Sequence, residues 1–415
     1  MIFGLLAILL TWSVGRRLAP AWPALVAAGV VALHPFQVVA SNEVRMYPLL
    51  TAAGLAATLA LIEAVREPGS AGRWALYGAL AASVAYVSYY GFLLLAGHAV
   101  GVALVRRRLR SWRGPIVGAG TAVLCYAPWI PSLLPSITSN PVPWRPPVTF
   151  SYLLGILLTQ TFGGYVLGTP AYHASGPATI WWYLLAVAFA IVLAAGLAHA
   201  LQKPGIGLIL FCSWLVPVSL VAAASVILNK EAAYYYHLTY LQPYAALLMV
   251  LGIVSIFRQV PAPSRNWVVM GCMVAVLSAV GLATHVAQNG SREVYRFDLA
   301  ARWMERRYSQ GDVTIYFAHV GQRVMRWYLR PVGPEVVISV SPHRWTLNDV
   351  RPLLRQAVAP LRVTHRRVWL VLTPPTPPGS VDELVRLLTE RGYGPARQGV
   401  TYGGVSVQLF ERRSR

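Results

Sequence analysis

Aspartate is absent from the chain before Gln288, and only four of its 14 acidic residues occur there. Those four are Glu43, Glu63, Glu67 and Glu231. Charged residues make up 12% of the 415 residues, whereas a soluble globular chain carries about 25%. A long stretch nearly free of carboxylates is typical of a chain surrounded by hydrocarbon. The sequence therefore predicts an α-helical polytopic membrane body over residues 1–286 and an aqueous domain over residues 287–415.

Cysteine is scarce too, because the chain has three cysteines and each lies inside an apolar run. None is paired at metal-ligand spacing, which argues against disulfides and cysteine-bound zinc. The net charge of +21 is also found in nucleic-acid-binding proteins. Here, however, many arginines lie in short loops between apolar runs, and the C-terminal part has no basic motif interleaved with aromatic residues. We therefore expect no nucleic-acid partner, and anionic lipid headgroups instead.

Apolar runs of adequate length predict about ten crossings, and the opening run, residues 2–14, is the shortest. The others are residues 20–40, 47–65, 74–89, 91–105, 115–134, 178–198, 206–228, 238–257 and 266–286. One set of alternate loops holds twelve basic residues, and the other holds only Arg45, Arg145 and Lys230. Because cytoplasmic loops are enriched in Lys and Arg, the second set faces outward. The prediction is a multi-pass protein of the plasma (inner) membrane with an extracytoplasmic C-terminal domain.

The first outward loop, about residues 34–47, holds the most unusual segment, which runs from His34 to Pro48. Glu43 and Arg45 are the acid and base of this segment, and placing them beside hydrocarbon is costly unless they pair or bind something. An arginine fork suits phosphate oxygens, and a glutamate suits a metal or a sugar hydroxyl. A structural ion pair at the interface is the alternative interpretation.

Two further outward loops, about residues 135–177 and 229–237, carry aromatic and basic side chains. Lys230 and His237 are suited to meet a phosphate, whereas Tyr236 and Tyr240 are suited to stack on a sugar. Arg145 lies in the longer loop, which is rich in Pro, Trp and Tyr. An aromatic belt that anchors the bundle is the alternative for both loops. Of the remaining polar groups, we expect His98 to be a hydrogen-bonded structural residue and Glu63 to be solvated near a cytoplasmic helix end.

The C-terminal region alternates strand and helix signals, which predicts a small α/β domain. The expected strands are residues 312–318, 335–340, 368–373 and 405–410, and the expected helices are residues 299–308 and 381–391. It lacks a glycine-rich phosphate loop, because Gly399 to Gly404 precedes a strand rather than a helix. No chemistry is assigned to it.

The segment SNEVRMYPLL, Ser41 to Leu50, lies between two crossings and follows Pro35. It resembles the Ser-Gln-Glu-Ala-Arg-Met-Tyr-like signature of bacterial GT-C glycosyltransferases of family 39, which use polyprenyl-phosphate sugars. These enzymes are related to the protein O-mannosyltransferase and aminoarabinose-transferase families. The wider layout is similar as well, from Ala127-Pro128-Trp129 at the end of one crossing to the tyrosine-rich loop before Pro243.

The resemblance implies transfer of a hexose or mannose-like sugar from a polyprenyl-phosphate donor to a protein or glycan acceptor on the outer face. Glu43 and Arg45 match the acid and base of the motif, with Asn42 and Tyr47 beside them. Arg45 is then expected to neutralise the departing phosphate. His34 is a further candidate for substrate binding, and the requirement for a divalent metal stays open.

In one respect the sequence departs from this family, whose general base is typically an aspartate in the first outward loop. No aspartate occurs in the membrane body. We expect that a first crossing and its loop lie upstream of Met1, or else that the chain is a variant without catalysis. Other interpretations are a transporter or scaffold for lipid-linked sugars and another polyprenyl-phosphate enzyme. Transport is disfavoured because the ionisable residues lie at loop ends and no internal repeat is found.

Overall fold

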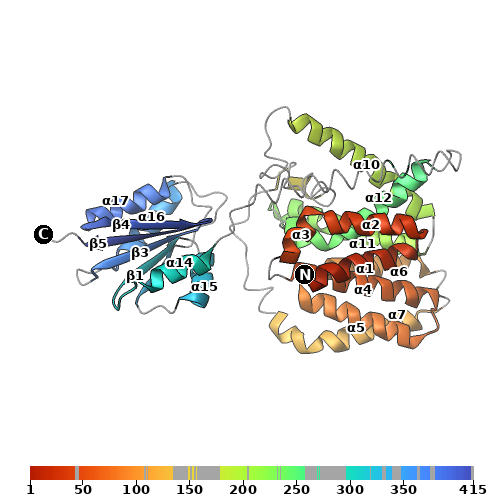
Figure 1. Cartoon of the computed structure of the whole chain (residues 1–415). Coiled ribbons are helices and arrows are strands. Elements are labelled where there is room, and N and C mark those ends of the chain that lie inside the picture. Colours follow the sequence, from red (N-terminus) through yellow and green to blue (C-terminus); the bar gives the residue numbers. More distant parts are fainter. Residues whose placement is uncertain are drawn as a thin grey trace. The chain divides into compact units, whose positions relative to one another are not determined.

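The computed structural model of the chain divides into two compact units, Met1–Gly290 and Ser291–Arg415 (Figure 1). The residues that it describes are 1–42, 46–106, 109, 111–133, 148–149, 152–153, 156, 178–202, 205–230, 232–233, 235–257, 269, 271, 296–317, 319–329, 333–338, 347–361, 365–373 and 379–412.

The first unit is built from helices alone in its described residues (Figure 1). They are α1 (Ile2–Arg16), α2 (Ala21–Leu33), α3 (Pro35–Asn42), α4 (Tyr47–Arg66), α5 (Ala71–Val87), α6 (Gly91–Leu104), α7 (Arg113–Tyr126), η2 (Ala127–Trp129), α10 (Ala178–Gln202), α11 (Ile206–Leu228), η4 (Tyr235–Leu241) and α12 (Gln242–Ile256). Their positions follow the predicted apolar runs closely. The run at residues 266–286 lies almost wholly outside the described residues.

Four segments among the described residues are long and apolar enough to cross a membrane. They are Tyr47–Arg66, Arg113–Leu133, Ile206–Leu228 and His237–Ile256. Four more apolar helices are shorter, and they include α1, α2 and α6. A helical membrane body is therefore confirmed, whereas the number of about ten crossings stays a prediction.

The run predicted at residues 20–40 is not one helix, because the chain breaks at His34. His34 is extended, with φ −66° and ψ 128°, since the ring of the following proline disfavours helical backbone at the preceding residue. Pro35 then begins the short helix α3, at a position where a missing N–H costs nothing. Three residues separate α5, which ends at Val87, from α6, which begins at Gly91.

Glycines bring several helices of the body into close contact. A Cβ added at Gly97 of α6 would lie 2.5 Å from the carbonyl oxygen of Cys212 on α11. One added at Gly252 of α12 would lie 2.0 Å from the carbonyl oxygen of Val192 on α10. Small residues allow such backbone approach, which is how helices associate where lipid removes the hydrophobic driving force between them. As a result α12 is buried along most of its length.

The second unit is a mixed five-stranded sheet with helices on both faces (Figure 1). Its elements are α14 (Phe297–Glu305), β1 (Val313–Phe317), α15 (His319–Tyr328), β2 (Glu335–Ile338), α16 (Leu347–Val358), β3 (Arg367–Leu372), α17 (Ser380–Glu390), β4 (Tyr393–Tyr402) and β5 (Val405–Arg412). The strand order is β2-β1-β3-β5-β4, in which the first three are parallel and β5 and β4 pair antiparallel. Alternate strand residues face α14 and α15 on one side and α16 and α17 on the other.

All four predicted strands and both predicted helices are present in this unit, but α15, α16 and β4 were missed. The glycine-rich stretch from Gly399 to Gly404 precedes a strand, β5, as predicted. Its first residues belong to β4, and Gly403, with φ +59°, makes the turn into β5. The prediction of a small α/β layer domain is confirmed.

Candidate functional site

Three rings from separate segments of the helical unit meet at the beginnings of α4, α6 and α12, and we call them the ring cluster. His237 of η4 stacks on Tyr90, which directly precedes α6, with ring centroids 4.4 Å apart and an interplanar angle of 18°. Tyr47, the first residue of α4, presents its edge to His237 at 6.0 Å. Segments distant in sequence thus place two phenol rings around one imidazole.

Hydrogen bonds to the backbone hold the η4 segment in place. The buried Gln37 side chain of α3 donates from Nε2 to the carbonyl oxygen of Thr239 at 3.0 Å. The Tyr240 hydroxyl donates to the carbonyl oxygen of Tyr90 at 3.0 Å, and the Tyr90 hydroxyl donates to that of Ala232 at 3.3 Å. Because these bonds link α3, η4 and the start of α6, the orientation of His237 is fixed from several sides.

A small cavity of about 170 Å³ lies beside α3 and is lined by residues of α1, α2 and α3. Gln37, Ser41 and the main-chain amine of Met1 contribute its polar groups, and Met1 donates to the carbonyl oxygen of Ser41 at 3.0 Å. Since Gln37 also binds the backbone of η4, the cavity and the ring cluster share one side chain.

Of the residues predicted for the site, the structure brings Tyr47, His237 and Tyr240 together. His34 is buried at the break between α2 and α3, and Lys230 is exposed beyond the end of α11. The remaining predicted residues cannot be placed in this way. Glu43, Arg45 and Arg145 lie outside the described residues, as do the side chains of Asn42 and Tyr236.

Sequence reasoning missed Tyr90 and Gln37. A weak signal was present for both residues, since each lies at an outward end of a predicted crossing.

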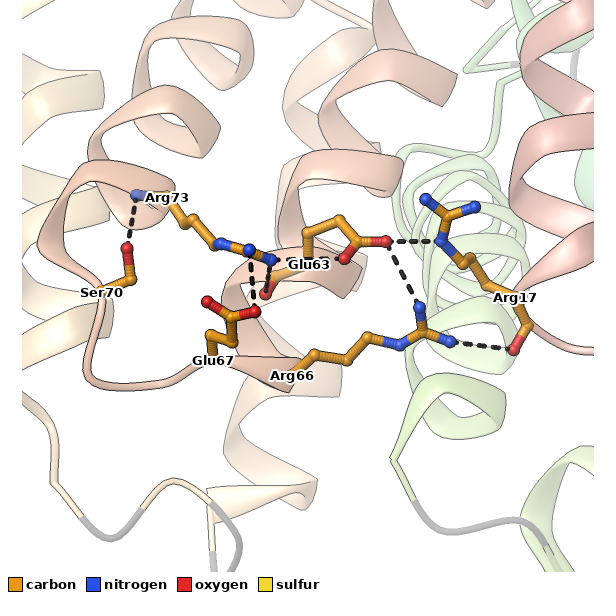
Figure 2. A network of polar contacts seen from close by, with 6 residues as sticks. All are labelled: Arg17, Glu63, Arg66, Glu67, Ser70 and Arg73. Carbon is orange, nitrogen blue, oxygen red and sulfur yellow. Dashed lines mark hydrogen bonds and ion pairs between the residues drawn. The ribbon is translucent and has the colours of Figure 1, made fainter.

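Glu63, at the opposite end of α4, was expected to be solvated; its side chain is 27% exposed and is also ion-paired. Its carboxylate sits among three arginines (Figure 2), with the Nε of Arg17 at 2.5 Å and nitrogens of Arg66 and Arg73 each at 3.4 Å. Arg73 also binds Glu67 at 2.8 Å. We call these five residues the Glu63 network. It ties the end of α1 to α4 and to the start of α5.

The Glu63 network bears on the site because carboxylates are so scarce in the body. Two of the four glutamates before Gln288, Glu63 and Glu67, are bound to arginines at the end of α4 away from the ring cluster. The other two, Glu43 and Glu231, precede α4 and η4 in the sequence and lie outside the described residues. In the part of the chain that the structure describes, no group of three His, Cys, Asp or Glu residues could hold a metal ion.

Residues 1–132 match the family described as dolichyl-phosphate-mannose-protein mannosyltransferase. No curated protein matches the chain. Among solved structures, the fold is similar to that of ArnT from Cupriavidus metallidurans bound to undecaprenyl phosphate, with a TM-score of 0.55 at 14% identity, covering 98% of this chain and 82% of that one. The apo ArnT structure gives 0.54 at 13% identity with the same coverage.

A third structure, the apo oligosaccharyltransferase of Archaeoglobus fulgidus, matches with a TM-score of 0.46 at 12% identity over 95% of this chain and 61% of that one. The resemblance drawn from the segment Ser41 to Leu50 is confirmed by the family match and by the ArnT fold. The family match is thus a similarity of residues 1–132, and the likeness to ArnT is one of fold.

Proposed function

We propose that this chain transfers a sugar, a hexose or a mannose-like one, from a polyprenyl-phosphate donor to a protein or glycan acceptor on the outer face of the membrane. The observation that carries the proposal is the position of the family signature. Ser41 to Leu50 connects α3 to α4, and these two helices also contribute Gln37 and Tyr47 to the residues around His237.

In the proposed reaction the bond between the anomeric carbon and the phosphate oxygen of the donor breaks. A bond forms between that carbon and a hydroxyl oxygen of the acceptor, and the hydroxyl proton passes to a carboxylate. Polyprenyl phosphate leaves with the electron pair of the broken bond. Negative charge therefore develops on the phosphate, and a positive group placed there lowers the barrier most. Arg45 is assigned this role.

Within the given residues, the role of general base is assigned to Glu43, the carboxylate of the segment that resembles the family signature. Glu63 and Glu67 are bound to arginines at the other end of α4, so neither is available to an acceptor near the signature. Glu231 is the remaining candidate, since it lies six residues before His237. Glu43 is preferred because it belongs to the signature itself.

The ring cluster is assigned to the donor. Tyr and His rings present apolar faces and polar edges, which suit a sugar ring attached to a phosphate. The stacking of His237 on Tyr90 fixes the plane of the imidazole, so that one ring edge is held in a constant direction. Lys230, Tyr236 and Tyr240 are assigned supporting roles in binding, together with His34, Asn42 and Arg145.

Membranes that contain the full chain are to be assayed with a panel of labelled polyprenyl-phosphate hexoses. Glu43→Gln is expected to reduce transfer by about 10²–10⁴-fold, the usual contribution of general acid–base catalysis. Arg45→Ala is expected to cost about 10²–10³-fold, as for loss of one group that stabilises the charge of the transition state.

Matched controls are Glu67→Gln and Arg113→Ala, which alter exposed charges away from the signature, and both should leave transfer unchanged. If Glu231→Gln abolishes transfer while Glu43→Gln does not, the base assignment moves to Glu231. If no donor in the panel supports transfer by the parent chain, the enzymatic proposal is wrong and a non-catalytic role in binding lipid-linked sugar takes its place.

A further inference from the structure

A second group of polar side chains lies deep among the helices of the body, and none of them belongs to the site described above. Thr58 of α4 is fully buried, and its hydroxyl oxygen lies 2.6 Å from the Tyr244 hydroxyl of α12 and 3.0 Å from Nε2 of His98 on α6. Nδ1 of His98 lies 3.4 Å from the Tyr77 hydroxyl of α5. We call Thr58, Tyr77, His98 and Tyr244 the Thr58 network.

The direction of each hydrogen bond at the Thr58 hydroxyl follows from counting donors and acceptors. The Thr58 hydroxyl also lies 2.8 Å from the carbonyl oxygen of Gly54, which can only accept, so Thr58 gives its single proton there. Its two lone pairs must then accept from Tyr244 and from Nε2–H of His98. Nε2 of His98 therefore carries a proton, and Nδ1 lies within hydrogen-bonding distance of the Tyr77 hydroxyl. Every hydrogen-bonding position of the Thr58 hydroxyl is occupied.

The helices that meet at Thr58 also carry the ring cluster. Tyr47 lies eleven residues before Thr58 on α4, Tyr90 lies eight residues before His98 at the start of α6, and His237 lies seven residues before Tyr244. With a rise of 1.5 Å per residue in α-helix and about 2.0 Å in 3₁₀-helix, the rings are about 12–16 Å from the network along each helix. The hydroxyl oxygen of Thr58 thus connects α4, α6 and α12, the three helices whose ends carry the ring cluster.

We propose that Thr58 is a positioning residue for sugar transfer, which sets the rotation of α6 and α12 against α4 and thereby the geometry of the ring cluster. This inference rests on the proposed function. A helix that rotates about its own axis moves its end residues as well, so a bond fixed in the middle of a helix constrains the ring at its end. Apolar side chains between helices have no comparable directional requirement, because in lipid they pack equally well on neighbouring hydrocarbon.

The chain offers a matched pair of substitutions. Thr58→Val keeps the shape of the side chain but leaves the buried donors of Tyr244 and His98 without their acceptor. Thr11→Val is the control, because Thr11 of α1 is equally buried and, among the described residues, its hydroxyl donates within its own helix to the carbonyl oxygen of Ala7. Thr58→Ser restores the hydroxyl and serves as the conservative rescue.

The first measurement does not depend on activity. In a full chain whose native cysteines are replaced by alanine, Tyr90→Cys and His237→Cys form a pair that a short bifunctional thiol reagent can join. We expect efficient cross-linking in this background and with Thr11→Val, a clear loss with Thr58→Val, and recovery with Thr58→Ser. Failure of the pair to cross-link without further changes, or equal yields in all backgrounds, would overturn the proposal.

The second measurement separates positioning from binding, in chains that keep Tyr90 and His237. With the donor that supports transfer, Thr58→Val is expected to lower kcat by about 10–100-fold while KM changes little, because a displacement of about 1 Å can cost about 10²-fold. Thr58→Ser and Thr11→Val should behave like the parent. If Thr58→Val does not accumulate in membranes, Tyr244→Phe takes its place, since it removes one bond and keeps the ring.

A rise in KM with unchanged kcat would show that Thr58 affects only donor binding, and it would contradict the positioning role. If the parent transfers no sugar, the proposed function fails. The cross-linking result then still decides whether Thr58 controls the geometry of the ring cluster.

Discussion

Replacing Glu63 by glutamine removes the carboxylate that Arg17, Arg66 and Arg73 share (Figure 2). The side chains of these residues are between about a quarter and two fifths exposed, so water screens each pair in part. Pairs of this kind contribute about 0.2–1 kcal/mol each. The three together give about 1–2 kcal/mol, to which the Arg17 pair at 2.5 Å contributes most. Removal also leaves positive charges close together, which adds to the loss.

Thermal unfolding of the purified chain in a neutral detergent measures this effect. A loss of 1 kcal/mol lowers the Tm of a unit of 150–250 residues by about 2–4 °C, so Glu63→Gln should lower it by about 2–8 °C. Glu67→Gln is the matched control, because among the described residues Glu67 pairs with Arg73 alone, and its side chain is 59% exposed. Its Tm should fall by about 2 °C or less.

The salt dependence tests the physical cause. At an ionic strength of about 1 M the Debye length is about 3 Å, so the difference between Glu63→Gln and the parent should narrow in high salt. Equal Tm losses for the two variants would refute the reasoning, because Glu63 would then be no more than one surface ion pair. A loss that is the same in low and high salt would refute it as well, since it would show that packing and not charge is responsible.

Three further predictions concern single side chains. Asp312→Ala removes a buried carboxylate that accepts hydrogen bonds from the indole N–H of Trp369 at 2.7 Å and from the backbone N–H of Ser309 at 3.0 Å. The free energy of unfolding of the second unit, measured by chemical denaturation, should fall by about 3 kcal/mol. Gly252→Ala places a methyl group against a carbonyl oxygen of α10 and should cost about 1–3 kcal/mol in thermal unfolding, whereas Gly120→Ala, with open space around it, should not destabilise. The hydrogen bond and charge of Arg386 lower the pKa of Glu383 to about 2, below its unfolded value of about 4.3. The contribution of Glu383 to the free energy of unfolding is therefore present above about pH 4.3 and is lost as the pH falls toward 2. When acid unfolding is followed by hydrogen exchange, Glu383→Gln should no longer show this loss.

The positions of the helices in the body could be predicted, because apolar runs bounded by charged or turn-forming residues leave few alternatives in lipid. The break at His34 was missed, although the proline after it is a local signal. In the second unit β4 was missed for a physical reason. Its sequence contains Gly and Pro, which strands avoid, and it is stable because it pairs with β5 as an edge strand with an irregular register between Pro395 and Gly399.

The site was predictable only in part, because its members were found one loop at a time. His237 and Tyr47 were singled out from their own segments, but the stacking of His237 on Tyr90 depends on how α6 and α12 are arranged. No local pattern encodes that arrangement. The same holds for the Thr58 network: His98 was expected to be hydrogen-bonded, which is confirmed, yet its partner Thr58 lies on another helix and carries no sequence signal of its own.

The two faces of α6 explain how a helix in lipid can hold a ring in a defined place. On one face, Gly97 and Gly101 bring the backbone of α6 against Cys212 and Ile209 of α11, so their separation is set by backbone contact. On another, His98 is tied to Thr58 of α4 through a directional hydrogen bond. Contact with α11 leaves α6 free to slide and rotate, whereas a bond to one oxygen atom on α4 does not. Because the two restraints come from different directions, together they fix the start of α6, where Tyr90 meets His237.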